Sequence, residues 1–154
     1  MKVIPELQAL DWDAPAANEL ILPQGIIGFA DYRRAELLFS ADHLPLLWMR
    51  LHGPATLHFV VMEPRGMIPG YEPEIFGEDV AELDLRTSAD AMVLNIVTLR
   101  RSQPLEATVN LIGPIIVNRR TRIGRQRVIA NHSRYSAQHP LVADLPVAAG
   151  SCSA

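Results

Sequence analysis

Twelve prolines and nine glycines interrupt this chain of 154 residues, and they constrain its fold more than any other feature of the sequence. Few uninterrupted segments are long enough for a helix with an apolar period of 3.6 residues, because proline breaks a helix and glycine weakens it. The remaining runs are short, rich in β-branched residues and bounded by turn residues. The sequence therefore predicts an all-β, mainly antiparallel fold.

The predicted strands follow one another at the spacing expected for a barrel or a sandwich. In the run 56–62, Leu57, Phe59 and Val61 fall on one face, and the residues between them fall on the other. Near the end of the chain, Gly113 and Pro114 predict a bulge or a break between two strands, because proline cannot donate a ladder hydrogen bond. The predicted strands are residues 36–39, 45–52, 56–62, 91–99, 107–112, 114–118 and 125–130.

Helical character is confined to short segments. Residues 77–85 carry Glu78 and Asp79 near their start, where carboxylates stabilise the first turn of a helix. A second helical turn is predicted at 30–36. We expect one compact β-barrel-like domain over residues 1–142, with one or two short helices. The small residues of 143–154 have no period and predict a flexible C-terminal tail.

Several apolar residues are assigned to the interior. Trp48 and Phe59 lie in predicted strands, and we expect both to anchor the core. The loop 23–29 has the sequence PQGIIGF, whose glycines predict a turn. Its apolar side chains are expected to form a buried plug, namely Ile26, Ile27 and Phe29.

Composition limits the compartment and the partners. The single cysteine, Cys152, allows no disulfide framework within one chain, which is typical of a reducing compartment. The N-terminus has no continuous apolar segment typical of a signal peptide, and no apolar run of about 18 residues is present. We therefore expect a cytoplasmic protein that does not bind a membrane. Its formal net charge of −3 restricts any nucleic-acid contact to a local patch.

Such a patch exists between two apolar runs in residues 107–129. Its cations can bind phosphates, but no aromatic residue for base stacking lies between Asn118 and Asn131. An acidic protein surface would be an equally good partner, and a solvated hairpin tip that discourages edge pairing is the third alternative. The residues alone leave all three open. The patch consists of Arg119, Arg120, Arg122, Arg125 and Arg127.

No pattern predicts a catalytic, cofactor or metal site. The five histidines form no HxxxH or HxH pair, and the glycines form no phosphate-binding loop. A run of carboxylates could hold a glycosidase-like acid pair, although we expect a solvated acidic face. These carboxylates are Glu63, Glu72, Glu74, Glu78, Asp79, Glu82 and Asp84.

Taken in order, several segments resemble the flagellar assembly factor FliW family. The most specific are PQGIIGF at 23–29, NLIGPIIVN at 110–118 and YSAQHPL at 135–141, and the resemblance covers residues 1–141. It implies a compact antiparallel β-barrel-like domain and a non-enzymatic regulator of flagellin production, and we expect the protein to be a monomer. Members of the family bind flagellin and CsrA, a small RNA-binding protein that represses flagellin translation. Because the two compete, export of flagellin frees the factor to capture CsrA.

In such a protein the RNA contact belongs to the partner, so direct binding of nucleic acid is not expected. The alternative is a small β-barrel RNA-binding module that uses the arginines of 119–127. Asn110 and Asn118 lie in predicted strands, where they either satisfy buried backbone groups near the Pro114 break, as we expect, or face a partner.

Partner-binding residues are expected mainly outside the strands, because loops carry binding residues, and tyrosine and arginine dominate interface energies. The candidates are Tyr71, Glu72, Arg119, Arg120, Arg122, Arg125, Tyr135, His139, Pro140 and Leu141.

Overall fold

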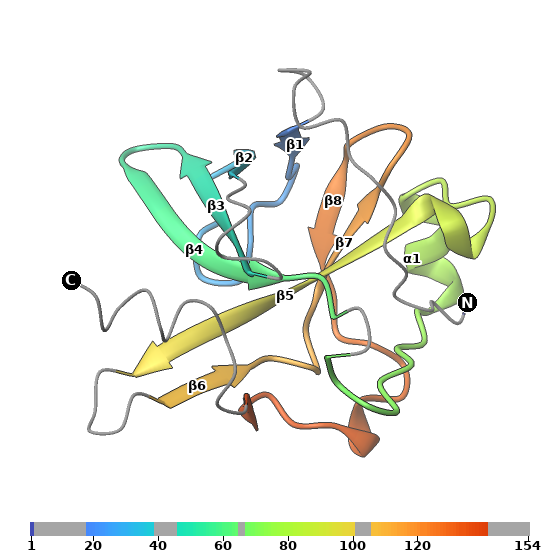
Figure 1. Cartoon of the computed structure of the whole chain (residues 1–154). Helices are drawn as coiled ribbons and strands as arrows, with labels where there is room; N and C mark the ends of the chain where they lie inside the picture. The colour runs from blue at the N-terminus through green and yellow to red at the C-terminus, as the bar shows by residue number, and fades with distance from the viewer. Residues whose placement is uncertain (2–17, 39–45, 65–66, 101–105, 142–154) are drawn as a thin grey trace.

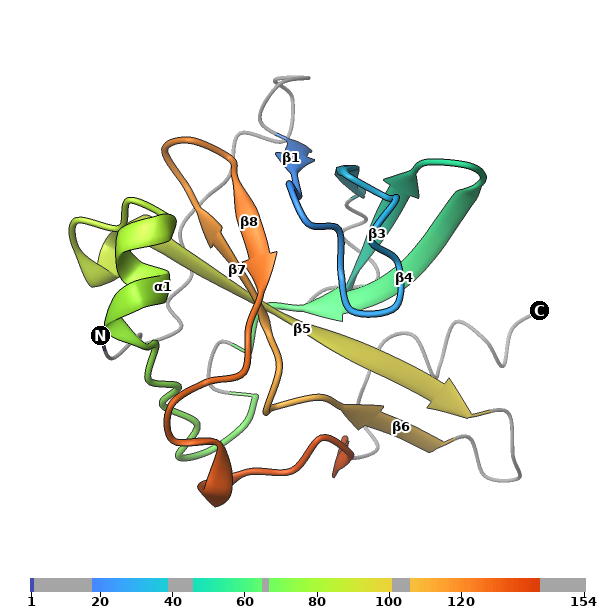
Figure 2. The same ribbon diagram turned by 180° about the vertical axis from the view of Figure 1, so that it is seen from behind.

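The structure, a computed structural model, describes residue 1 and residues 18–38, 46–64, 67–100 and 106–141. Its strands form one mainly antiparallel sheet that curls into a half-barrel, as Figures 1 and 2 show from opposite sides. The predicted all-β class is confirmed, whereas the tail predicted over 143–154 lies outside the described residues. The strands are β1 (Glu19–Ile21), β2 (Arg34–Leu38), β3 (Leu46–His52), β4 (Thr56–Met62), β5 (Ala91–Arg100), β6 (Glu106–Val109), β7 (Ile115–Asn118), β8 (Gly124–Gln126) and β9 (His139–Pro140).

Helices contribute little to the described part of the chain. The helix α1 spans Gly77–Glu82, and single 3₁₀ turns span Ser88–Asp90 and His132–Arg134. None of these helices is long or apolar enough to cross a membrane. The predicted helix over 77–85 therefore forms but ends three residues early, where Leu83 turns its buried side chain toward the sheet.

The long strand β5 connects the two halves of the sheet. Its first half, Ala91–Leu94, pairs with β7, and its second half pairs with β6. On its other edge β5 pairs with β4, and from there the sheet continues in the order β3, β2 and β1. Figure 1 shows β5 as the long diagonal strand from which β7 and β8 rise on one side.

Both faces of β5 are covered, and the two-residue period of the strand sorts its side chains between different cores. Met92 and Leu94 enter the largest cluster, together with residues of β1–β4 and β7. The alternate residue Val93 faces α1, and Val97 enters a third cluster with Tyr71. β5 thus connects the two halves of the sheet and also contributes side chains to all three hydrophobic clusters.

A polar break separates β6 from β7, as the sequence predicts. Pro114 cannot donate to β5, and the backbone leaves the ladder between Asn110 and Pro114. The Asn110 side-chain oxygen accepts hydrogen bonds from the backbone N–H groups of Ile112 and Gly113, both at 3.0 Å. The expected role of Asn110 in satisfying backbone groups is confirmed.

A second asparagine, which the sequence analysis did not single out, supports the same break from β5. Asn95 is fully buried, and its side-chain amide donates to the Asn110 carbonyl at 2.9 Å and to the Tyr71 hydroxyl at 3.1 Å. The Tyr71 hydroxyl donates in turn to the Leu111 carbonyl at 2.9 Å. These hydrogen bonds stabilise the buried amide nitrogen of Asn95 and the buried hydroxyl of Tyr71.

Asn118 has a comparable role at the β7–β8 hairpin, at a distance from the break between β6 and β7. Its side-chain oxygen accepts from the backbone N–H groups of Arg120 and Thr121. Its amide donates to the carbonyls of Leu83 and Asp84, at 2.8 and 3.1 Å. One fully buried side chain therefore closes the hairpin and fixes the end of α1 to it.

Two interior assignments were wrong. Trp48 is 41% exposed, because its neighbours Leu47 and Met49 take the core face of β3 and alternation places the indole on the opposite face. Ile27 is 69% exposed, and only Ile26 of the adjacent pair is buried. Phe59 is partly buried and packs against the largest cluster.

One further local prediction was wrong, and two strands were missed. Residues 34–36 of the predicted helical turn belong to β2, where Ala35 is drawn into the core. The strands β1 and β9 were not predicted, because segments of three and two residues carry no detectable period. They are defined by the neighbours with which they pair.

We predict that Asn118→Ala lowers the free energy of unfolding by about 2–4 kcal/mol, because it leaves buried carbonyl and N–H groups without partners. Urea denaturation followed by circular dichroism measures this loss. The control Gln138→Ala changes an exposed residue and should stay within about 0.5 kcal/mol of the wild type. An equally small change for Asn118→Ala would contradict the assigned role.

Candidate functional site

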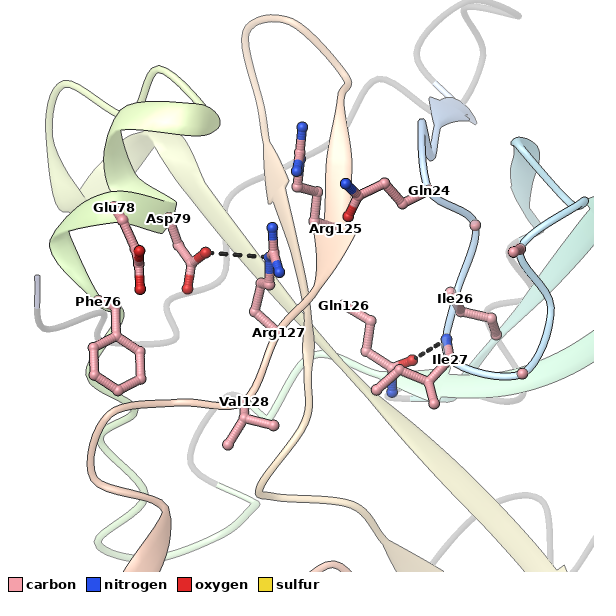
Figure 3. A pocket seen from close by; sticks show the side chains of 13 residues that line it. Gln24, Ile26, Ile27, Phe76, Glu78, Asp79, Arg125, Gln126, Arg127 and Val128 are labelled. Atoms are coloured by element: carbon pink, nitrogen blue, oxygen red, sulfur yellow. Dashed lines mark hydrogen bonds and ion pairs between the residues drawn. The ribbon is translucent and has the colours of Figure 1, made fainter.

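The arginines of 119–127 lie along the β7–β8 hairpin, and the structure brings the acidic segment against them. Arg125 contacts the Glu82 carboxylate at 3.0 Å, and Arg127 contacts the same carboxylate at 2.8 Å. Arg127 also reaches Asp79 at 3.1 Å, and Asp79 is largely buried. Figure 3 shows Arg127, the residue directly after β8, directed toward Asp79 of α1. Two charged clusters that are separate in the sequence therefore neutralise each other.

The innermost pair joins Arg119 to Glu63, which directly follows β4. The guanidinium and carboxylate are 2.8 Å apart, and the two side chains are only 14% and 5% exposed. The Arg119 backbone N–H also donates to the Asp90 carbonyl at 2.7 Å. A candidate partner-binding residue is thus largely enclosed in a structural ion pair.

The remaining arginines of the cluster differ in their surroundings. Arg120 binds the Asp84 carboxylate at 2.7 Å, and this hydrogen bond lowers the pKa of Asp84 below its ordinary value. Arg122 has a positive φ of 63° and forms no ion pair within the described residues. Desolvation, with a smaller contribution from the charge of Arg119, lowers its pKa.

As a result, the arginine cluster offers no continuous row of free cations. Exposed arginines without an ion pair are found elsewhere in the described chain, at Arg33, Arg34 and Arg134. Arg33 and Arg34 lie at the start of β2, whereas Arg134 lies in the 3₁₀ turn before β9. The solvated-tip alternative also fails for Arg119, which is largely buried.

Another set of candidates meets around a pair of tyrosines. Tyr71 is buried, and its ring meets that of Tyr135 edge-on with centroids 4.9 Å apart. The Tyr135 hydroxyl accepts from the Glu72 backbone N–H at 3.0 Å and donates to the Gly70 carbonyl at 3.2 Å. Since burial disfavours the tyrosinate, the pKa of Tyr71 is raised to about 12.

The last candidates were expected outside strands, and this was wrong for two of them. His139 and Pro140 form β9, which pairs with β6. Leu141 continues past the strand and packs against the cluster that contains Tyr71. Tyr135 and His139 line an open groove of about 610 Å³ together with Arg134, so a contact with a partner there stays a prediction.

A different groove, which the sequence analysis missed, lies between the loop at 24–28, α1 and β8 (Figure 3). Its volume is about 560 Å³, and Ile27, Phe76 and Val128 line it with 69%, 45% and 46% of their surface exposed. These are three of the six large apolar side chains that are exposed in the described chain. The signal in the sequence was the consecutive pair Ile26–Ile27, because a tight turn cannot bury both.

The loop wall of this groove is held in place by backbone contacts. Gly25 has a φ of 63°, and a side chain there would place its Cβ 2.2 Å from the Phe29 carbonyl oxygen, so only glycine fits. The backbone N–H of Ile27 donates to the Gln126 side chain of β8 at 2.8 Å. The segment PQGIIGF at 23–29 therefore shapes one wall of the groove and presents Ile27 on it.

Comparison with known proteins agrees with this architecture. The model of the family described as "FliW protein" matches residues 8–141, which is most of the chain. This chain belongs to the FliW family. It is similar to the flagellar assembly factor FliW of Natranaerobius thermophilus, with 34% identity over 125 residues, which cover 81% of this chain and 82% of the relative.

A second FliW relative, from Desulfitobacterium hafniense, is 36% identical over 119 residues, and the match covers 77% of each chain. A crystal structure of the flagellar assembly factor FliW superposes with a TM-score of 0.68 at 27% identity, covering 82% of this chain and 87% of that one. The family and fold implied by the three sequence motifs are confirmed.

The carboxylates of this FliW protein are engaged differently from a catalytic pair. Glu63, Asp79, Glu82 and Asp84 each contact an arginine, whereas a glycosidase needs one carboxyl group with a raised pKa. Within the described residues, no three histidine, cysteine or acidic side chains are grouped to hold a metal ion.

We predict that Arg119→Met lowers the free energy of unfolding by about 3 kcal/mol or more, because it leaves the Glu63 carboxylate buried without its cation. Arg120→Met serves as the matched control, since the Arg120–Asp84 pair is exposed and should contribute far less. Urea denaturation of both variants gives the comparison. Equal losses for the two would show that the Arg119 pair has no special structural role.

A pH prediction concerns Tyr71. Its pKa rises from 10.0 in the unfolded chain to about 12 in the folded protein, so its stabilising contribution is complete below pH 10 and is lost as the pH rises toward 12. The urea concentration at the unfolding midpoint should therefore fall between pH 10 and 12. For Tyr71→Phe this midpoint should start lower and should fall less steeply over the same interval. Urea denaturation across pH 8–12 tests this, and parallel curves would disprove it.

Proposed function

We propose that this FliW-family protein is a non-enzymatic, monomeric cytoplasmic regulator that works by stoichiometric capture of other proteins. Its partners are flagellin and a CsrA-like translational regulator, which compete for it. Capture of the regulator relieves repression of flagellin translation. In support, the relatives from Natranaerobius thermophilus and Desulfitobacterium hafniense are named flagellar assembly factors and align over more than three quarters of their length.

The observation that carries this proposal is the internal neutralisation of the arginine cluster. Proteins gain affinity for RNA when lysine and arginine replace the counterions of phosphates. In the β7–β8 hairpin, Arg119, Arg120 and Arg125 are already paired with the protein's own carboxylates at 2.7–3.0 Å. Binding of phosphate would have to break these pairs, so the RNA-binding alternative loses its main support.

Exposed apolar side chains around the groove at 24–28 favour a protein as the partner. Ile27, Phe76 and Val128 remain in contact with solvent around one groove, next to neutralised charges. Clustered apolar groups with a polar rim are typical of protein–protein contacts. A competition mechanism needs no reaction centre, since the concentration of free flagellin alone decides how much protein is left for the regulator.

We predict that the purified protein binds the flagellin and the CsrA-like protein of its own organism with dissociation constants of about 10 µM or tighter, and that one displaces the other. Isothermal titration calorimetry measures each affinity, and a titration of the preformed complex measures displacement. If the protein bound neither flagellin nor the CsrA-like protein, the proposal would be contradicted. Binding of flagellin leader RNA by the isolated protein, with a steep salt dependence, would instead support the RNA-binding alternative.

A further inference from the structure

The floor of the groove at 24–28 is formed by Gln126, the last residue of β8, and by Arg127 and Val128 directly after it. The N–H groups of Arg127 and Ile129 donate to the carbonyls of Pro114 and Ile112, at 3.1 and 3.0 Å, so the antiparallel pairing of β8 with β7 continues past both strands and alternate residues face the segment 112–114. By the alternation of antiparallel pairing, the backbone groups of Gln126 and Val128 point the opposite way, toward the groove. Both residues line it, and Val128 is exposed.

The two walls of the groove stand on either side of this floor. Figure 3 shows Arg127 directed toward Asp79 of α1, and Gln126 on the other side of the chain, next to Ile27. Arg125 also contacts α1, at Glu82. Because side chains of a strand alternate between the faces of a sheet, an added strand would direct its own side chains to both walls. Phe76 would receive one set and Ile27 the other.

The charges on the rim are unequal. Asp79 and Glu82 are matched by Arg125 and Arg127, whereas Glu78 is exposed and forms no ion pair with any described residue. A basic side chain on the occupant would complement this carboxylate.

We propose that this groove binds an extended segment of a protein partner by strand addition along Gln126–Val128. The segment places apolar side chains against Ile27 and Phe76 and a basic side chain beside Glu78. Backbone hydrogen bonds supply affinity in this mode of recognition, and pockets for alternate side chains supply specificity. The inference rests on the proposed function, because it assigns a surface and a binding mode to the capture of protein partners.

The first test measures the affinity of variants for the organism's own flagellin and CsrA-like protein. Ile27→Gln, Phe76→Gln and Glu78→Lys should each weaken binding of at least one of them by about tenfold or more. Met67→Gln is the matched control, since Met67 is 41% exposed but lies outside the groove, and it should change affinity by less than about twofold. Thermal unfolding of each variant verifies that the fold is retained.

The second test distinguishes strand addition from simple apolar contact. Residue-resolved amide hydrogen exchange should show that the amides of Gln126 and Val128 exchange quickly in the free protein and become protected when the partner binds. The amide of Arg127, which already donates to Pro114, should be protected in both states.

The outcomes separate the inference from the function on which it rests. If the wild type binds a partner but the groove variants bind equally well, the inference is wrong and the proposed function stands. If the variants weaken binding while the amides of Gln126 and Val128 stay unprotected, strand addition is wrong. Absence of any binding by the wild type overturns the inference and the proposed function together.

Discussion

The pairing of the β7–β8 arginines with the carboxylates of residues 63–84 determines which surface this protein can offer. Burial of the Arg119–Glu63 pair has a desolvation cost that only close contact offsets, and the structure supplies 2.8 Å. The pairs of Arg125 and Arg127 with α1 then hold the helix beside β8. Charges that look like a binding patch in the sequence instead fix the walls of a groove and leave its apolar side chains as the accessible feature.

This arrangement depends on a sheet that changes partners along one strand. β5 can pair with β6 and then with β7 because Asn95 and Asn110 satisfy the backbone groups at the break. Without that break, β7 and β8 would not be directed toward α1 and the loop at 24–28. Asn118 then closes the hairpin onto the end of α1. The buried Asn95 and the partly buried Asn110 therefore supply hydrogen bonds at the break, and the buried Asn118 supplies them at the hairpin.

Membership of the FliW family and the geometry of the groove point to the same kind of activity. A half-barrel with neutralised charges and exposed Ile27, Phe76 and Val128 supports the proposed capture of another polypeptide. In the proposed complex, the backbone groups of Gln126 and Val128 would add directional hydrogen bonds to this apolar contact. Exposed backbone groups of this kind are normally a risk for aggregation, and here the α1 and loop walls restrict access to them.

The sequence by itself determined the all-β class and the break at Pro114, because two-residue alternation and the missing N–H of proline act over a few neighbouring residues. The order of its motifs determined the family. The sequence did not determine that Trp48 and Ile27 are exposed, that β1 and β9 exist, or that Arg119 is buried. Those properties depend on which segments meet, and Arg119 lies 56 residues from Glu63 while Arg125 lies 43 residues from Glu82. Alternation specifies that a side chain has two possible faces, but only the curled sheet decides which face is covered.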